Sequence, residues 1–145
     1  RLDCAKSFGA TDTINASEKN AIEEVMRLTD GAGADVVFET AGSAVTAAQT
    51  TDYLKRCGTI VVVSNIHKQT PIRFMDLMYK EGEIKTIYRY RNNFKTAIAA
   101  VSSGSIDVKG MISKVFPFEQ CDEALASSLR DKMSIVKLVI EIAGE

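Results

Sequence analysis

The chain has 145 residues, of which 46% are hydrophobic and 26% are charged, and its formal net charge at pH 7 is −1. This composition is typical of a globular domain, and the nearly balanced charge gives no reason to expect a nucleic acid or an anionic membrane as a partner. No apolar run approaches the ~20 residues that cross a bilayer, and no signal peptide is visible. We therefore expect a cytoplasmic protein whose partners include neither nucleic acid nor a membrane.

The hydrophobic patterns predict helices and strands that alternate along the chain. The predicted helices cover residues 1–8, 18–29, 44–56, 74–80, 93–102 and 118–129. The predicted strands cover residues 11–15, 35–40, 59–64, 84–88, 111–116 and 134–142. Alternation of this kind indicates the α/β class with a parallel sheet.

Local signals set the ends and the buried sides of these elements. Ser17 and Ser43 are the predicted N-caps of the second and third helices, and Gly9 ends the first helix. The mostly polar strand 11–15 is expected near a sheet edge. We expect the buried sides of the third and last helices to include Val45, Ala48, Thr51, Leu54, Cys121, Ala124 and Leu125.

The stretch around which the chain is organised runs from Asp35 to Gly42. Its apolar run is bounded by turn residues, as in a buried parallel strand, and the strand 59–64 follows after one helix. Strand, helix and strand at this spacing form a βαβ unit, which is right-handed in nearly all proteins. Because open α/β sheets bind ligands beyond the carboxyl ends of their strands, we look for function at Glu39–Gly42 and Ser64–Asn65.

The glycines do not form a phosphate-binding loop. Gly31 and Gly33 precede a strand, whereas the Rossmann fingerprint needs glycines after a strand and at the start of a helix, where backbone N–H groups reach the pyrophosphate. We interpret this pair as a helix-to-strand turn. Gly42 has the right position but stands alone.

The other reactive side chains give no catalytic or metal-binding pattern. Cys4, Cys57 and Cys121 form no C-x-x-C pair or Cys/His cluster, so neither a zinc site nor a disulfide is indicated, and we expect reduced thiols. The single histidine, His67, lies in a loop, where a surface residue and a proton shuttle are both open interpretations.

The segment Tyr88-Arg89-Tyr90-Arg91-Asn92 follows a strand at the rim of the expected ligand crevice. Arginine offers a fork of donors to phosphate or carboxylate groups, and tyrosine adds a flat face and a hydroxyl. A binding site and a solvated strand end with arginine stacked on tyrosine both account for this segment, so both interpretations stay open.

Several motifs occur in the order and spacing of one enzyme family. They are Arg-Leu-x-x-Ala-Lys-x-Phe-Gly-Ala (1–10), Leu-Thr-Asp-Gly-x-Gly-Ala-Asp-Val (28–36), Gly-Thr-Ile-Val-Val-Val (58–63), Tyr-Arg-Tyr-x-Asn (88–92), Gly-Ser-Ile-Asp-Val (104–108), Phe-Pro-Phe-Glu (116–119) and Glu-Ala (123–124). Over essentially its whole length the chain resembles the coenzyme domain of medium-chain, zinc-dependent alcohol dehydrogenases. The sorbitol (polyol) dehydrogenase branch is the most similar, and threonine dehydrogenases are close to it.

The resemblance implies a partial Rossmann domain, which is a doubly wound parallel sheet lacking its first two strands. Residues 1–104 would form this NAD-binding domain, and residues 105–145 a C-terminal strand–helix–strand segment that returns to a catalytic domain. The family's glycine-rich turn and zinc ligands would lie upstream of Arg1, so we expect the chain to be the C-terminal part of a longer enzyme. The missing strands would leave sheet edges exposed, which predicts rearrangement or a homo-oligomer.

The resemblance also implies site residues by position. Arg1 matches the basic residue near the adenosine ribose, and Arg89 with Tyr90 matches the polyol-binding pair. Asn65 departs from the apolar residue that is usual in the family, and Arg91 replaces a small one. The implied cofactor-binding residues are Arg1, Thr40, Ala41, Gly42, Val63, Ser64, Asn65, Ile87, Tyr88 and Arg89.

The implied activity is NAD-dependent oxidation of an alcohol or polyol, a small-molecule substrate. In the full-length parent, zinc polarises the alcohol and hydride passes to nicotinamide. No catalytic residue or metal ligand is implied in this chain, so we expect the isolated chain to be inactive. The choice between NAD and NADP stays open, because the selecting residue would lie upstream of Arg1.

Two alternatives remain at this stage. A standalone, non-enzymatic α/β binding or assembly module would account for the missing glycine fingerprint. A zinc-free, quinone reductase-like oxidoreductase would share the coenzyme domain, but the Tyr-Arg-Tyr segment is not expected there.

Overall fold

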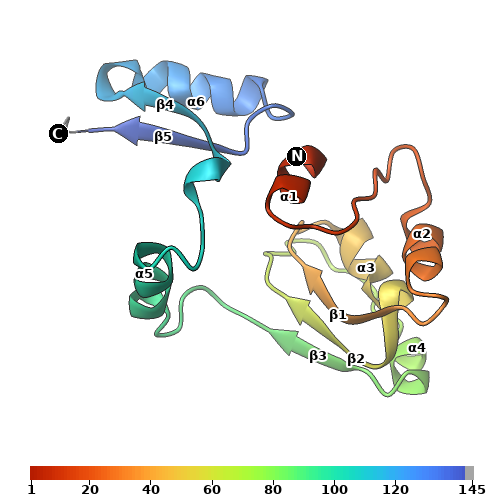
Figure 1. Ribbon diagram of the computed structural model, residues 1–145. Helices are drawn as coiled ribbons and strands as arrows, with labels where there is room; N and C mark the ends of the chain where they lie inside the picture. The colour runs from red at the N-terminus through yellow and green to blue at the C-terminus, as the bar shows by residue number, and fades with distance from the viewer. Residues whose placement is uncertain (143–145) are drawn as a thin grey trace. The chain divides into compact units, whose positions relative to one another are not determined.

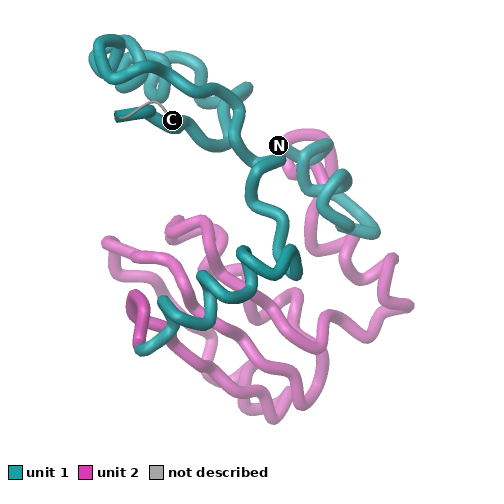
Figure 2. The backbone as a smooth tube through the Cα atoms, turned by 60° about the vertical axis from the view of Figure 1, so that its left-hand side comes forward, with its two compact units in different colours: residues 1–13, 92–145 teal, residues 14–91 magenta. Residues whose placement is uncertain are grey.

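The structure, a computed structural model, describes residues 1–142. Contacts between Cα atoms divide the chain into two compact units (Figure 2). One unit contains residues 14–91, and the other contains residues 1–13 and the described residues from 92 onward. The predicted boundary near residue 105 concerns the domains of a longer enzyme and stays a prediction.

The unit of residues 14–91 contains a parallel sheet of three strands in the order β1-β2-β3 (Figure 1). Its strands are β1 (Ala34–Glu39), β2 (Leu54–Val62) and β3 (Glu83–Thr86). Its helices are α2 (Ala21–Leu28), α3 (Ala44–Tyr53) and α4 (Phe74–Tyr79). Glu39 pairs with Val62, and Val62 pairs with Thr86, so the three carboxyl ends meet at one edge, as predicted.

The core of this unit lies between the sheet and α3. Leu54 and Ile60 of β2 are each 1% exposed, and Thr51 of α3 is 2% exposed. Burial of these apolar groups is the main force that holds helix and sheet together. The Lys80 ammonium donates hydrogen bonds to the carbonyl oxygens of Thr51 (2.6 Å) and Leu54 (2.7 Å) at the end of α3. It thereby satisfies carbonyl groups that a helix end leaves without partners.

The other unit contains a second, smaller parallel sheet. Strands β4 (Ile112–Pro117) and β5 (Lys137–Glu141) pair in parallel, and α6 (Cys121–Arg130) connects them in the sequence. This confirms the predicted strand–helix–strand segment. Its remaining helices are α1 (Leu2–Ser7), α5 (Phe94–Ser102) and two 3₁₀ turns, η1 (Lys109–Met111) and η2 (Phe118–Gln120). None of the described helices has the length and apolar character needed to cross a bilayer.

Two predictions about the start of the chain are wrong. Residues 11–15 form no strand. The last of these residues, Asn15, forms a local turn instead: its Oδ1 accepts hydrogen bonds from the N–H (3.1 Å) and the hydroxyl (2.7 Å) of Ser17. Ser17 is therefore not the N-cap of α2. The helix begins at Ala21, and the Asn20 side chain accepts hydrogen bonds from two N–H groups of its first turn.

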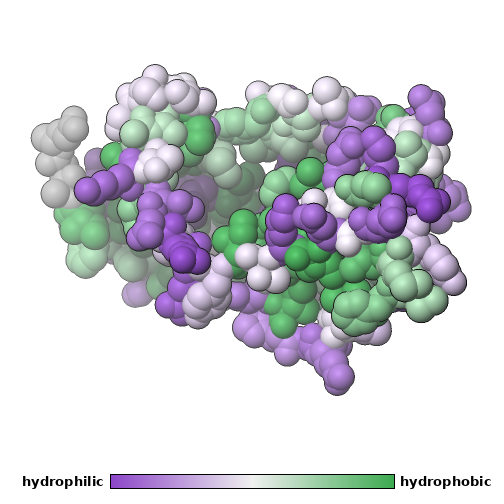
Figure 3. Space-filling model, turned by 90° about the horizontal axis from the view of Figure 1, so that it is seen from below, coloured by the Kyte–Doolittle hydropathy of each residue, from purple (hydrophilic) through white to green (hydrophobic). Residues whose placement is uncertain are grey.

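The prediction that β1 is buried on both faces is also wrong. Val36 and Phe38 are 47% and 62% exposed, whereas Glu39 is 3% exposed. Alternate side chains of a strand point to opposite faces, so one face of β1 meets α3 and the other carries exposed apolar groups. Val45 and Leu125 are 66% and 59% exposed, against expectation, because each lies on the side of its helix away from the strands. Apolar side chains are visible at the surface in Figure 3.

The turn before β1 offers a matched pair of glycines as a test. Gly31 and Gly33 both have left-handed φ angles, +80° and +85°, where alanine costs about 1–2 kcal/mol. A Cβ on Gly33 would also lie 2.8 Å from the Tyr53 carbonyl oxygen, whereas nothing lies within 4 Å of a Cβ on Gly31. We expect Gly33→Ala to lower the free energy of unfolding in urea by roughly 1–3 kcal/mol more than Gly31→Ala, because backbone atoms must shift. Equal losses would contradict this packing.

Candidate functional site

The turns that follow the three parallel strands form the candidate site. Hydrogen bonds continue from the strands into these turns. The N–H groups of Val63 and Ser64 donate to the Glu39 carbonyl oxygen at 3.0 and 3.2 Å, and the Ile87 N–H donates to the Val62 carbonyl oxygen at 3.0 Å. Backbone pairing therefore holds the three turns beside one another. The turns cover residues 40–43, 63–66 and 87–90.

The side chain of Glu39 lies at the centre of the first two turns and is buried. Its Oε1 atom accepts hydrogen bonds from the N–H groups of Ala41 and Gly42, both at 3.2 Å. The same atom accepts one from the Thr46 hydroxyl at 2.8 Å, and Oε2 accepts one from the Ser64 hydroxyl. One carboxylate thus contacts the turn after β1, the first turn of α3 and the turn after β2.

The surroundings of Glu39 favour its ionised form. Burial by itself raises the pKa of a carboxyl group, because it disfavours the charge. The hydrogen bonds from Ser64, Thr46 and the two backbone N–H groups outweigh burial here and bring the pKa of Glu39 below its ordinary value. Among the described residues, no buried side-chain nitrogen or oxygen atom lacks a hydrogen-bond partner. Glu39 is therefore an anion at neutral pH.

The first two turns approach each other closely at Gly42. Its φ is +69°, and a Cβ at this position would lie 3.0 Å from the Asn65 carbonyl oxygen. The predicted N-cap of α3 is confirmed next to it, since the Ser43 hydroxyl accepts a hydrogen bond from the Val45 N–H at 3.2 Å. A cavity of about 380 Å³ opens here and is lined by Gly42, Ser43, Ala44, Val45, His67 and Lys68.

The third turn carries large exposed side chains. Tyr88 and Tyr90 are 74% and 68% exposed, and Ile87 is 49% exposed. The Arg89 guanidinium lies 5.1 Å from the centre of the Tyr88 ring, a stacking contact that belongs to one of the two interpretations left open for this segment. Arg89 has a φ of +54°, a conformation that is uncommon for a residue with a side chain and that occurs often at ligand sites.

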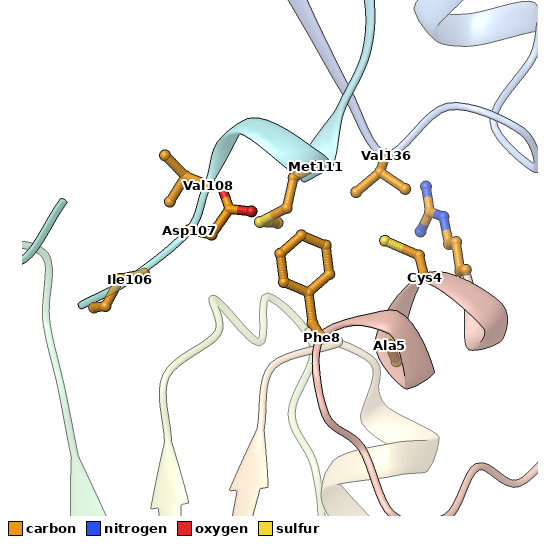
Figure 4. A pocket seen from close by; sticks show the side chains of 9 residues that line it. Cys4, Ala5, Phe8, Ile106, Asp107, Val108, Met111 and Val136 are labelled. Atoms are coloured by element: carbon orange, nitrogen blue, oxygen red, sulfur yellow. The ribbon is translucent and has the colours of Figure 1, made fainter. Parts of the chain in front are cut away.

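Arg1 belongs to the other unit, whereas the remaining predicted site residues lie within residues 14–91. Its guanidinium donates to the carbonyl oxygens of Lys132 (3.1 Å) and Ile135 (3.4 Å). Beside it, α1 and two segments of the same unit enclose an apolar cavity of about 520 Å³, into which Phe8 and Met111 point (Figure 4). The cavity is lined by Arg1, Cys4, Ala5, Phe8, Ile106, Asp107, Val108, Met111 and Val136.

The described residues bring together no three His, Cys, Asp or Glu side chains that could hold a metal ion. The thiols of Cys4, Cys57 and Cys121 are free.

Glu39 lies in the stretch 39–42 where function was expected, but neither Glu39 nor Thr46 is among the predicted site residues. Glu39 is the last residue of an apolar strand, and a Thr-Ala-Gly turn and a helix follow it. An acidic residue just before a turn of small residues is a signal for a carboxylate that accepts backbone N–H groups. The contribution of Ser64 comes from a neighbouring strand and has no local signal.

Comparison with known proteins gives a consistent result. The model of the family of zinc-binding dehydrogenases matches residues 1–103. An uncharacterized zinc-type alcohol dehydrogenase-like protein of Escherichia coli is 37% identical over 143 residues, and a sorbitol dehydrogenase of Bacillus subtilis is 30% identical over 141 residues. These alignments cover 99% and 97% of this chain but 41% and 40% of the relatives. The chain thus spans about two fifths of the length of the curated relatives it matches.

Solved structures share the fold. An Escherichia coli oxidoreductase/dehydrogenase of unknown specificity has 36% identity and a TM-score of 0.91, covering 99% of this chain and 41% of its own. A zinc-binding dehydrogenase of Sinorhizobium meliloti bound to NADP has 26% identity and a TM-score of 0.78, covering 86% and 38%. The predicted fold class, α/β with a partial Rossmann domain, is confirmed.

The lowered pKa of Glu39 predicts how the stability of this edge depends on pH. A carboxylate whose pKa is lower in the folded than in the unfolded state stabilises the fold above its ordinary pKa of 4.5, and this contribution is lost as the pH falls through the folded value. We expect Glu39→Gln to cost roughly 2 kcal/mol in urea unfolding at pH 7. The difference in the free energy of unfolding between this variant and the wild type should shrink steadily below pH 4.5. A difference that is constant down to full protonation would contradict this assignment.

Proposed function

Because the chain belongs to the family of zinc-binding dehydrogenases, we propose that it is the coenzyme-binding part of an NAD-dependent alcohol or polyol dehydrogenase. The parent enzyme would transfer a hydride from a secondary alcohol to the coenzyme. The observation that carries the proposal is the meeting of three exposed turns at the carboxyl edge of the parallel sheet, where open α/β sheets bind ligands. A polyol substrate is proposed because the relatives include a sorbitol dehydrogenase.

The turn residues would bind and orient the coenzyme in two halves. The turn after β1 would lie beside the adenosine half, where the absence of a side chain at Gly42 leaves backbone close to the surface. The turns after β2 and β3 would lie beside nicotinamide, which accepts the hydride when bound. The proposed contacts of the sheet edge are Thr40, Ala41, Gly42, Val63, Ser64, Asn65, Ile87, Tyr88 and Arg89, and Arg1 is the proposed contact of the adenosine ribose.

Arg89 and Tyr90 are proposed to bind substrate hydroxyl groups. Tyr90 is 68% exposed, and the Arg89 guanidinium stacks on a neighbouring ring and so loses less freedom when it binds. NAD is proposed over NADP by analogy with polyol dehydrogenases. A homo-oligomeric state and a cytoplasmic location stay predictions from the sequence.

The chain by itself should be inactive, because zinc and the residues that bind the pyrophosphate would come from other parts of the parent. We expect no NADH when the purified chain is incubated with NAD, zinc and sorbitol, while the parent enzyme in the same assay forms NADH. Zinc-dependent formation of NADH by the chain alone would contradict the proposal that it is only the coenzyme-binding part.

In the parent enzyme, Tyr90→Phe tests the proposed substrate contact. Loss of one hydroxyl hydrogen bond costs about 0.5–1.5 kcal/mol, so the KM for the polyol should rise roughly 2- to 12-fold while the KM for NAD stays unchanged. Tyr79→Phe is the matched control, because Tyr79 is 63% exposed on α4 and has no proposed contact with substrate or coenzyme. Equal effects of the two substitutions would remove Tyr90 from the site.

A further inference from the structure

Within residues 1–142, the charge of Glu39 has no ionic partner. The ion pairs of the described residues do not include this carboxylate, and the donors that reach it are two backbone N–H groups and two hydroxyls. A buried carboxylate costs free energy that an apolar side chain would avoid. The proposed hydride transfer does not use it. Its role must therefore lie in the geometry that its hydrogen bonds impose.

The donors come from two separate segments. Three of them belong to residues 41–46, immediately after β1. The fourth is the Ser64 hydroxyl in the turn after β2, and Ser64 lies 25 residues after Glu39 in the sequence. The backbone bonds from Val63 and Ser64 to the Glu39 carbonyl oxygen end the strand pairing at this point. Beyond it, the bond between the Glu39 carboxylate and Ser64 is a side-chain link between the two turns.

We propose that Glu39 is a positioning residue, whose carboxylate fixes the turn after β1 to the turn after β2 through Ser64. This inference rests on the proposed function, since these are the turns that would contact the two halves of the coenzyme. Glu39 is too deeply buried to touch the coenzyme itself and acts through the atoms that it holds. The close approach of Gly42 to Asn65 requires the same fixed geometry.

We call the link from the Glu39 carboxylate to the Ser64 hydroxyl the tether. Replacing Glu39 by glutamine tests it, because the two side chains differ in the hydrogen bonds that they can accept. A carboxylate accepts hydrogen bonds at both oxygen atoms, whereas a glutamine amide has one accepting oxygen and one NH₂ donor. Glu39→Gln therefore keeps the shape of the side chain but turns a donor toward either the turn after β1 or Ser64. Ser64→Ala removes only the link to the turn after β2, and Ser64→Thr restores a hydroxyl.

Amide hydrogen exchange of the full 145-residue chain, followed by NMR, tests the tether. In Ser64→Ala, the amides of Ser64 and Asn65 should exchange roughly tenfold faster, while those of Ala41 and Gly42 change little. In Glu39→Gln, both turns should exchange faster. Ser64→Thr should restore wild-type rates. Asp35→Asn is the control on the same strand. It removes an exposed ion pair with Lys55 (2.8 Å) at the start of β1 and β2, away from both turns, and such exposed pairs contribute little, so both turns should stay unchanged.

This selective pattern separates positioning from general destabilisation, which would accelerate the amides of β2 and β3 as well. Unchanged exchange in the two turns, or equal acceleration across the whole sheet, would overturn the tether. Ser64→Ala decides the question even where Glu39→Gln does not fold.

Titration of the parent enzyme carrying the same substitutions, with NADH and with ADP-ribose, separates the tether from the proposed function. We expect Glu39→Gln to weaken NADH binding several-fold more than binding of ADP-ribose, which lacks nicotinamide. If the variants show the selective exchange pattern but the unsubstituted parent enzyme binds neither ligand, the proposed function is contradicted and the tether is left intact. NADH binding that Glu39→Gln does not affect would show that the tether does not act on the coenzyme.

Discussion

The parallel pairing of β1, β2 and β3 is the constraint on which the rest of residues 14–91 depends. Its register places Glu39, Val62 and Thr86 in one row, so each strand ends at the same edge. The burial of Leu54 and Ile60 of β2 holds that register, because a one-residue slip would turn these apolar side chains to the opposite face. Core packing thus determines where the candidate site lies, and the residues of the turns determine which groups the site offers to a ligand.

The Glu39 carboxylate makes that edge rigid as well as polar. Its hydrogen bonds to Gly42 and Thr46 place a negative charge at the start of α3, where the helix presents N–H groups without partners and favours an anion. A turn fixed in this way can hold a ligand within the narrow geometry that hydride transfer needs. Loops tied only by backbone pairing would orient a ligand less well.

The order and direction of β1, β2 and β3 could be predicted from the sequence because apolar runs separated by single helices allow few arrangements. Features that depend on competition between neighbours could not. Asn15, predicted as the end of a strand, accepts hydrogen bonds from Ser17 instead. Asn20, and not Ser17, is the N-cap of α2, since several residues with suitable side chains lie close together in the sequence. The link from Ser64 to Glu39 joins residues that are distant in the sequence, so no local pattern reveals it.

The exposed face of β1 connects the fold to the proposed function. Parallel sheets are normally covered on both faces, yet Val36 and Phe38 are 47% and 62% exposed in the described structure. Under the proposed function, other residues of the parent's coenzyme domain would cover this face, and burial of the exposed part of each side chain would contribute about 1–2 kcal/mol, roughly half of what full burial contributes. The strand that gains this stability also ends at Glu39. Packing on the exposed face of β1 in the parent would therefore also hold Glu39 in place. The stability of the coenzyme domain and the orientation of the coenzyme would then depend on the same strand.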